Sequence, residues 1–418
     1  MFTKKSISLL LVMLVAFIDL MGIGLVYPMF ASMLYQGNCL LLPVDTSETA
    51  RGACLGILLA TMPLTQFFSA PLLGSLSDQK GRRKVLIPSL AVGIVGYVIA
   101  IAAVSIENLA LLLLSRIAIG ISAGTASVVG AALADISTPE EKAKNFGLLN
   151  MAGGLGFTIG PFLGGLLSSL SFWHIEGYAL PFALAGFVTF LNLILVIIFF
   201  DETYAPKSQH RLSLSLAFLN IQKAFQLQKL RAVFGAVFLA CVGWSFYWEF
   251  TPVTWISIYG FDTSTIGNYY AFGAAVYALS CGLLIRPIVN KFSNQHVLCY
   301  SLIGLGISIG MLLFHSHQAW LWLYIPLQQF TVALFWPTAA ATVSNSVGDD
   351  MQGEILGVFQ SVDSLAFALS PLIAGPLLGI SSSMPLIVGS SATLLAAAVL
   401  GRFLMSSSKQ SSRLSNLN

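Results

Sequence analysis

Residues 74–84 read Gly-Ser-Leu-Ser-Asp-Gln-Lys-Gly-Arg-Arg-Lys, with four cations around the single acid Asp78. Long apolar stretches flank this segment at 53–75 and 85–106. Because a helix needs about 20 apolar residues to cross a bilayer, each stretch is long enough to span a membrane. Gly81 permits a tight turn between them. We therefore interpret residues 74–84 as a short charged loop at the membrane surface.

The whole chain shares this apolar character. Hydrophobic residues make up 56% of its 418 residues and charged residues only 9%, whereas a soluble domain carries about 25% charged residues. This composition excludes an ordinary soluble enzyme, a nucleic-acid-binding protein and a disordered scaffold. Twelve stretches are long and apolar enough to cross a membrane: 7–33, 53–75, 85–106, 109–134, 145–170, 178–200, 232–258, 264–288, 296–314, 319–344, 354–380 and 384–405. We expect an all-α integral membrane protein without room for an extramembranous catalytic domain.

Lysine and arginine are distributed unequally between the two sides of these stretches. When the N-terminus is placed in the cytoplasm, all of the 20 Lys and Arg residues except Arg51 and Arg116 fall on the cytoplasmic side or at its edge. This distribution obeys the positive-inside rule. We therefore expect both termini in the cytoplasm, and the short loops favour a bacterial inner membrane.

An internal repeat divides the chain almost in half. Residues 147–167 align with residues 357–377 at an offset of 210, and Pro161 meets Pro371. Many transporters consist of two such repeats related by an axis along the membrane normal, with the site at their interface. We predict an N-terminal six-helix bundle at 1–200, a cytoplasmic central loop at 201–231, a C-terminal six-helix bundle at 232–405 and a cytoplasmic tail at 406–418.

Two opposite charges lie inside predicted spans of the first half. A charged side chain in hydrocarbon costs roughly 2.5–3.5 kcal/mol on insertion scales, so it needs a partner or access to water. At 1.5 Å per residue, Asp19 lies roughly 18 Å from the cytoplasmic edge and Arg116 roughly 20 Å. We expect these residues to pair and to couple proton exchange to transport. The alternative is a static structural ion pair.

The second half holds two further intramembrane acids. Glu249 lies in the outer half of the span at 232–258, and Asp363 lies in the inner half of the span at 354–380. An intramembrane carboxyl group indicates a functional site, because its charge is costly there. We predict that Glu249 and Asp363 exchange protons or hold a cationic group of the substrate.

Aromatic residues are concentrated in the second half. Trp244 and Trp248 share one helix face, and Phe330 and Trp336 lie deep in a later span. Aromatic walls with a few acids suit a lipophilic or cationic organic molecule, through stacking and cation–π contacts. We assign these four residues and Gln360 to a candidate substrate cavity. The alternative is that the aromatic rings face lipid.

Other chemistry is not indicated by the sequence. It contains no ATP-binding motif, no nucleophile with a nearby base and no metal-ligand spacing, so we expect neither a cofactor nor a metal. The expected partners are protons, a small-molecule substrate and the lipid bilayer, with the chain acting as a monomer. Cys39 and Cys54 flank the predicted outer loop at 36–52, and their pairing in an oxidising compartment is left open.

The loop at 74–84 resembles the signature loop of the major facilitator superfamily, Gly-x-Leu-x-Asp-x-x-Gly-Arg-(Arg/Lys), and matches it throughout. The resemblance implies a major facilitator fold of twelve helices in two pseudo-symmetric halves. It also implies that the loop gates the cytoplasmic side. The residues to which it assigns gating are Gly74, Asp78, Gly81, Arg82 and Arg83. The counterpart in the second half, from Gly282 to Lys291, is degenerate.

Two further strings are similar to motifs of the same superfamily. Arg116-Ile-Ala-Ile-Gly120 resembles its fourth-span motif, which is linked to proton coupling, although Ile119 stands where the family often has Gln. The fifth predicted span carries a second string: Gly156, Gly160, Pro161, Gly164 and Gly165. That string resembles the fifth-span motif of the superfamily's antiporters, which importers generally lack. It implies efflux, and the alternative is plain tight packing of small residues.

The first span resembles that of the tetracycline-resistance transporters. Its residues 19–25 read Asp-Leu-Met-Gly-Ile-Gly-Leu. Those transporters also have acids in their third and ninth spans and a His in their eighth. Here the spans at 85–106 and 296–314 contain no acid, and the span at 264–288 contains no His. The resemblance therefore implies drug efflux and leaves the substrate open.

The sequence as a whole predicts a proton-coupled transporter that exports a small amphipathic or cationic organic compound by alternating access. A proton-symporting importer of a nutrient or siderophore is the main alternative, because it would use the same fold. A membrane receptor or scaffold would carry no flux. An intramembrane enzyme would need a nucleophile and a base in one cavity, and the sequence offers no such set.

Overall fold

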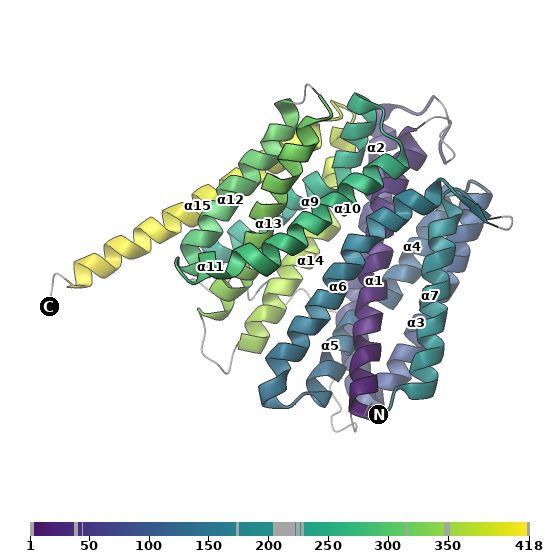
Figure 1. The fold of residues 1–418 in the computed structure, drawn as a ribbon, viewed down its shortest axis with the longest axis horizontal. Helices are drawn as coiled ribbons and strands as arrows, with labels where there is room; N and C mark the ends of the chain where they lie inside the picture. Colours follow the sequence, from purple (N-terminus) through teal and green to yellow (C-terminus); the bar gives the residue numbers. More distant parts are fainter. Residues whose placement is uncertain are drawn as a thin grey trace. The chain divides into compact units, whose positions relative to one another are not determined.

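The computed structural model describes residues 4–36, 41–43, 45–172, 175–203, 222, 226, 230–314, 317–346 and 352–415. These residues are helical apart from turns and one short hairpin (Figure 1). Cys39 and most of the predicted loop at 201–231 lie outside the described residues.

Helices in the first half begin and end close to the predicted stretches. They are α1 (Lys4–Tyr35), α2 (Glu48–Lys80), α3 (Arg82–Ser105), α4 (Leu109–Ala123), α5 (Thr125–Ile136), α6 (Pro139–Ser168) and α7 (Ala179–Phe199). The stretch predicted at 109–134 is divided into α4 and α5 at Gly124, which packs against Ser69 of α2. Between α6 and α7, β1 (Ser171–Phe172) and β2 (Ile175–Glu176) pair in antiparallel orientation.

Helices in the second half follow the same pattern. They are α9 (Arg231–Tyr259), α10 (Thr263–Leu279), a π-helical turn (Ser280–Leu284), α11 (Ile285–Val289), α12 (Asn294–Met311), a 3-10 turn (Leu312–Phe314), α13 (Trp320–Ser344), α14 (Gln352–Leu377) and α15 (Met384–Ser415). α15 continues as a helix beyond residue 405, where the predicted span ends.

Polar residues cap three helices of the first half. Ser47, Asn108 and Thr138 each precede a helix, and each side-chain oxygen accepts a hydrogen bond from the backbone N–H three residues later, at 3.3, 3.0 and 3.3 Å. Such caps satisfy N–H groups that have no partner within the helix. The start of α2, α4 and α6 is therefore determined locally by the sequence.

The helices are suited to a membrane. Ten helices of the described chain are long and apolar enough to cross one. The predicted spans at 264–288 and 319–344 are also helical, as α10 to α11 and as α13, but they fall outside this set, so the number twelve stays a prediction. α10 ends after 17 residues in a π-helical turn, which shortens its regular part.

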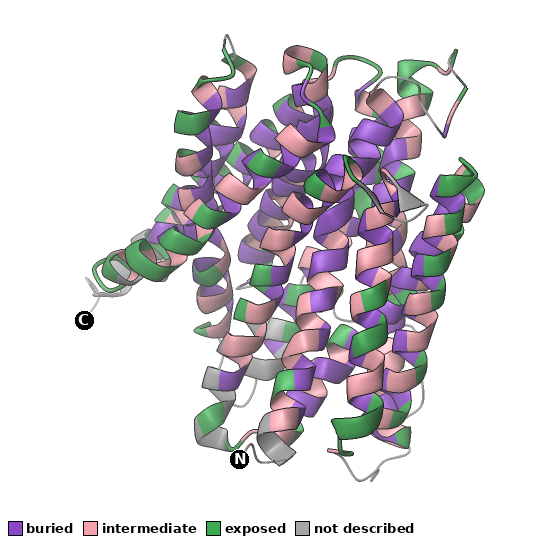
Figure 2. Ribbon diagram, turned by 45° about the vertical axis from the view of Figure 1, so that its right-hand side comes forward, coloured by how far each residue is buried: buried purple, intermediate pink, exposed green. Residues whose placement is uncertain are grey.

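Exposed apolar side chains occur along the helices and not only at their ends. Figure 2 shows exposed residues at many levels of the helices. Leu10, Val98 and Ile198 are 64%, 60% and 63% exposed. Soluble monomers rarely expose large apolar areas, whereas lipid-facing helices do so. The chain is therefore an integral membrane protein with an all-α fold.

The structure comprises two compact units. The first contains Met1–Ala217 and Trp255–Ala271, and the second contains Phe218–Thr254 and Phe272–Asn418. The end of α9 and the start of α10 therefore pack with helices from the first half of the sequence. Each unit has its own apolar core. That of the first involves α1, α3, α5 and α7, and that of the second involves α9, α12, α13, α14 and α15.

Candidate proton-coupling and substrate residues

α1 and α6 approach each other at their backbones within the first unit. Gly156, Gly160 and Gly164 lie four residues apart on α6 and face the backbone of α1, and a Cβ at Gly160 would lie 2.6 Å from the carbonyl oxygen of Met21. Small residues permit such close helix contacts in membranes. Three α1 residues with the same spacing are the partners: Phe17, Met21 and Leu25. The ring of Pro161 packs against Gly24.

Gly165, the last residue of the same string, faces a different helix. It lies against Gly267 of α10, where a Cβ would approach the Cα atom of Gly165 to 3.0 Å. Nearby, Gln36 donates a hydrogen bond to the Phe261 carbonyl, and Thr263 donates one to Gln36 at 3.4 Å. These contacts hold the start of α10 against α1 and α6.

Asp19 is half-buried on α1. The hydroxyl of Thr125, at the start of α5, donates a hydrogen bond to its Oδ2 atom at 3.1 Å. Among the ion pairs of the described residues, none joins Asp19 to Arg116, so the predicted direct pair is wrong. α1 packs mainly against α6, α7 and α5, whereas α4 packs against α3 and α2. Similar depth in the membrane therefore does not bring the two side chains into contact.

Arg116 is only 2% exposed. Its Nη2 atom lies 3.1 Å from the sulfur of Met62, and its guanidinium lies 5.4 Å from the centre of the Phe30 ring. Cation–π contact with an aromatic ring stabilises a desolvated cation. Two other guanidinium nitrogens, Nε and Nη1, have no hydrogen-bond partner among the described residues. Arg116 is thus a buried cation that is incompletely neutralised.

The segment at 74–84, predicted as a loop, is helical except at Gly81, because α2 continues to Lys80 and α3 begins at Arg82. Its charges are organised around Arg82, which is 4% exposed. Its guanidinium lies 2.5 Å from Asp78, 2.9 Å from Asp135 at the end of α5, and 2.6 Å from the hydroxyl of Ser77. A cation this deeply buried is tolerated when it is paired and hydrogen-bonded. We refer to Arg82, Asp78 and Asp135 as the charge cluster.

Gly81 has a φ of +99°, in the region that favours glycine. This conformation leads the chain directly into α3, where Glu202 accepts hydrogen bonds from the backbone N–H groups of Arg82 at 2.7 Å and Arg83 at 3.2 Å. A carboxylate at a helix N-terminus is favoured by the helix dipole. The Arg83 side chain donates to the carbonyl of Ile197 on α7 at 2.5 Å.

The two acids of the second unit lie on different helices. Glu249 of α9 is 1% exposed, and its Oε2 atom has no hydrogen-bond partner in the part of the chain that the structure describes. Asp363 of α14 accepts a hydrogen bond from Gln360 at 3.3 Å, and the thiol of Cys241 lies beside its carboxyl group. Cys241 and Glu249 are eight residues apart on α9, with Ser245 between them, so they lie along one side of that helix.

The candidate substrate aromatics fall into two groups in the second unit. The rings of Trp244 and Trp248 stack with their centres 5.3 Å apart, and both residues are 5% exposed. Trp336 instead packs edge-to-face on Phe335 at 4.8 Å and against the apolar core of the unit. Phe330, on the same helix as Trp336, is half-buried. The structure places the first group on α9 and the second on α13.

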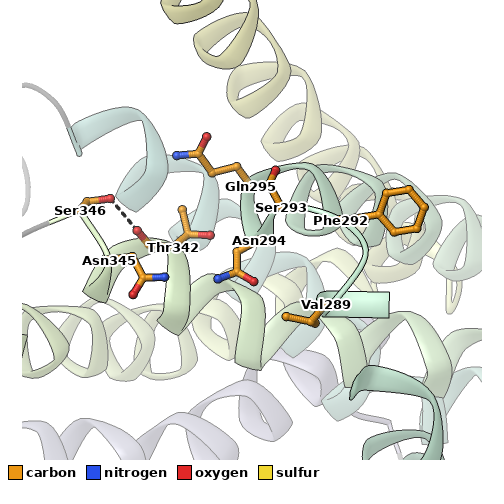
Figure 3. A pocket seen from close by; sticks show the side chains of 8 residues that line it. All are labelled: Val289, Phe292, Ser293, Asn294, Gln295, Thr342, Asn345 and Ser346. Carbon is orange, nitrogen blue, oxygen red and sulfur yellow. Dashed lines mark hydrogen bonds between the residues drawn. The ribbon is translucent and has the colours of Figure 1, made fainter. Parts of the chain in front are cut away.

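One pocket of the second unit has a volume of about 370 Å³ and is lined by α11, α12 and α13 (Figure 3). Its lining is mostly polar and includes Phe292 and Asn345, but it contains none of the predicted site residues. At the repeat offset of 210, Asn345 corresponds to Asp135. The pocket therefore lies where the second half lacks the charge cluster, consistent with its degenerate loop.

Comparison with profiles of known families shows to which family the chain belongs. The profile described as Major Facilitator Superfamily matches residues 9–371 and, in a second match, residues 233–417. The chain belongs to the major facilitator superfamily. Members of this superfamily are transporters.

Several curated members of the superfamily are similar over most of their length. The class C tetracycline resistance protein of Escherichia coli is 28% identical over 91% of this chain and 92% of its own. The class G tetracycline resistance protein of Vibrio anguillarum is 28% identical over 87% and 88%. The quinolone resistance protein NorA of Staphylococcus aureus is 25% identical over 88% and 89%.

Solved structures of the superfamily share the fold. A D-xylose–proton symporter has a TM-score of 0.77 at 15% identity, covering 96% of this chain and 98% of its own. The human organic anion transporter MFSD10 (TETRAN) has a TM-score of 0.69 at 21% identity, covering 96% and 100%. At these identities the likeness concerns the fold alone.

Sequence analysis did not predict the residues that contact Asp19 and Arg116, nor two further buried polar residues. Thr125, Met62 and Phe30 surround Asp19 and Arg116, but they are ordinary residues in apolar stretches and carry no motif. Asn192 and Gln328 are both 0% exposed, and their amide groups lack hydrogen-bond partners within the described residues. Their amide side chains inside apolar stretches are the sequence feature from which Asn192 and Gln328 could have been predicted.

Proposed function

We propose that this superfamily member is a proton-coupled secondary transporter that exports a small amphipathic or cationic organic compound. The observation that carries the proposal is the glycine string of α6 against the backbone of α1, because that string resembles the antiporter motif. The relatives named tetracycline and quinolone resistance proteins support the same direction. Drug or metabolite efflux is therefore the expected activity.

Alternating access provides the mechanism. The halves at 1–200 and 232–405, joined by the loop at 201–231, move relative to one another so that the substrate site opens to one side of the membrane at a time. The chain acts as a monomer in a bacterial inner membrane, with both termini and the tail at 406–418 in the cytoplasm. Asp78, Arg82 and Asp135 hold the cytoplasmic ends of α2, α3 and α5 together in one state, and their rearrangement accompanies the other.

Proton exchange takes place at the buried carboxyl groups. Asp19 binds a proton from the outer side and releases it to the cytoplasm, so that an inward proton gradient drives the substrate outward. Thr125 holds the carboxyl group in place, and the positive charge of Arg116 favours release of the proton. Asp363 and Glu249 exchange a further proton or hold the cationic group of the substrate.

The substrate binds against aromatic rings of the second half. Trp244 and Trp248 offer stacked faces for a planar or cationic group. Phe330, Trp336 and Gln360 complete the proposed cavity. Because the spans at 85–106 and 296–314 lack the acids of tetracycline transporters, tetracycline is not the expected substrate.

Everted membrane vesicles provide the test. We would impose an acid-inside proton gradient, report it with a pH-sensitive dye, and add a panel of lipophilic cations and siderophores. Substrate-dependent proton release in the wild type, lost in Asp19→Asn, is the expected result. The matched control is Asp45→Asn, which makes the same change in an exposed loop and should retain exchange.

Two outcomes would contradict the proposal. Substrate movement in the same direction as the protons would indicate an importer. Exchange that persists unchanged in Asp19→Asn would remove the coupling role from Asp19. An immunoblot of the vesicles checks that each variant is inserted to the same level.

A further inference from the structure

The hydroxyl of Tyr97, on α3, packs against α1 within one helical turn of Asp19, although neither spacing nor motif links the two residues. Tyr97 is 5% exposed, and its hydroxyl packs onto α1 at Gly22. A Cβ at Gly22 would overlap the hydroxyl oxygen but would lie 3.6 Å from the ring carbon Cζ. Gly22 follows Asp19 by three residues, so the hydroxyl and the carboxyl group lie along the same side of α1.

The ring of Tyr97 is held from the other side by α7. A Cβ at Gly186 would lie 3.0 Å from the Cβ atom of Tyr97, so α7 passes close to the base of this side chain. The tyrosine is therefore wedged between two glycines on different helices. Its hydroxyl position is set by packing and does not depend on a flexible side chain.

The hydroxyl is within electrostatic reach of both buried charges. Both Asp19 and Arg116 interact electrostatically with Tyr97. Arg116 has two nitrogens without a partner among the described residues, and it has only donors. A phenol hydroxyl can donate a hydrogen bond to a carboxylate and accept one from a guanidinium.

We propose that Tyr97 is a positioning residue that links Asp19 to Arg116 during proton exchange. When Asp19 is ionised, the hydroxyl donates a hydrogen bond to its carboxylate. In both protonation states of Asp19, the hydroxyl oxygen accepts a hydrogen bond from Arg116. This inference rests on the proposed function, in which Asp19 carries the exchanged proton.

Few other charges face this group. α2, α4, α5 and α7 pack against α3. α4 contributes only Arg116, α7 has no charged residue, and α5 has Asp135 at its far end, paired with Arg82. The charged residues of α2 lie at its two ends. α6, which packs against the helix of Asp19, has its charged residues only among its first six: Glu140, Glu141, Lys142 and Lys144. A pH-dependent change caused by Tyr97→Phe therefore reports on Asp19, with Arg116 and Tyr27 as the remaining ionisable neighbours.

The first test measures stability and needs no transport. Tyr97→Phe removes only the hydroxyl, and we expect it to lower the Tm of the purified protein more at alkaline than at acid pH, because the lost hydrogen bond is to ionised Asp19. In an Asp19→Asn background the same substitution should lose this pH dependence. Tyr277→Phe, at a half-buried tyrosine of the second unit, is the control and should show none. An equal loss at every pH in Tyr97→Phe would overturn the link to Asp19.

The second test checks the geometry with a double-mutant cycle. Gly22→Ala places a methyl group on the Tyr97 hydroxyl and should reduce Tm and exchange in the wild type. In Tyr97→Phe the methyl group meets only the ring carbon at ordinary contact distance, so Gly22→Ala should add little further loss. Full additivity of the two substitutions would overturn the predicted contact.

The transport readout separates this inference from the proposed function. Where the wild type exchanges substrate for protons, Tyr97→Phe should move the pH of half-maximal exchange upward, because an ionised Asp19 without its donor forms less readily. An unchanged pH profile would overturn the inference while the proposed function stands. Absence of any exchange in the wild type would overturn the proposed function, and the pH-dependent Tm would then decide the Asp19–Tyr97 link alone.

Discussion

The Nε atom of Arg82 lies 2.9 Å from the Oδ2 atom of Asp135, so the first turn of α3 is tied to the last turn of α5. A carboxylate at the C-terminal end of a helix is repelled by the helix dipole, and Arg82 offsets this repulsion. Arg82 is deeply buried, whereas Asp78 is 44% exposed and Asp135 only 19%. The two acids of the charge cluster should therefore contribute unequally.

Asp135→Asn should destabilise the protein more than Asp78→Asn. Loss of one partner from a buried ion pair costs about 3–5 kcal/mol, and we expect the low end of this range for Asp135. Loss of an exposed partner costs about 1 kcal/mol or less, as expected for Asp78. Thermal unfolding in detergent measures both. Glu48→Gln is the control, because the Glu48 side chain is 63% exposed in its pair with Arg51. A larger effect of Asp78→Asn than of Asp135→Asn would refute this order.

Gly160→Ala should reduce both stability and transport. The added methyl group meets the carbonyl oxygen of Met21 at 2.6 Å, so α1 and α6 must separate. Gly154→Ala is a matched control on the same helix, because nothing lies within 4 Å of a Cβ there. It should be neutral or stabilising by about 0.5–1 kcal/mol, since alanine favours helix over glycine. Equal effects of the two substitutions on Tm would show that the glycine string is not a packing surface.

Glu249→Gln should lower substrate-coupled proton exchange without lowering Tm. Burying a carboxyl group whose Oε2 atom lacks a partner among the described residues is costly, and glutamine removes the ionisable group while keeping the shape. Dye-reported exchange in everted vesicles and Tm in detergent are measured on the same preparation. Glu48→Gln again serves as the exposed control. A large drop in Tm with normal exchange would assign Glu249 a structural role.

Gly267→Ala should weaken the contact between α6 and α10. Its Cβ would lie 2.9 Å from the carbonyl oxygen of Pro161 and 3.0 Å from the Cα atom of Gly165. The hydroxyl of Tyr178 lies 3.3 Å from the hydroxyl of Thr263, and neither group ionises near neutral pH. We therefore expect a loss of Tm that does not depend on pH. Gly130→Ala, where a Cβ meets nothing within 4 Å, is the control, and a matching loss there would disprove the contact.

Much of the helical framework could be predicted from the sequence. The apolar stretches recur in the structure as helices, and Ser47, Asn108 and Thr138 cap helices where polar residues precede apolar runs. The resemblance of the segment at 74–84 assigned gating to Asp78 and Arg82, and the structure adds Asp135 and Glu202 as partners of Arg82. Those two residues lie far along the chain, so local spacing did not reveal them.

The neighbours of the buried charges could not be predicted in the same way. Asp19 and Arg116 were matched by depth, yet Asp19 bonds to Thr125 and Arg116 packs on Met62. Depth follows from counting residues along a helix, but contact also requires that two helices be adjacent and turned toward each other. α1 and α4 mainly contact other helices.

The sequence by itself determined the membrane class, the position of most helices and the presence of buried charges, because apolar length and the cost of charge in hydrocarbon act locally. Only the tertiary structure decided which side chains meet. The glycines of α6 lie against the backbone of α1, and Gly22 leaves room on α1 for the hydroxyl of Tyr97 from α3. Such contacts depend on the packing and rotation of whole helices, and these arise only when the chain is folded.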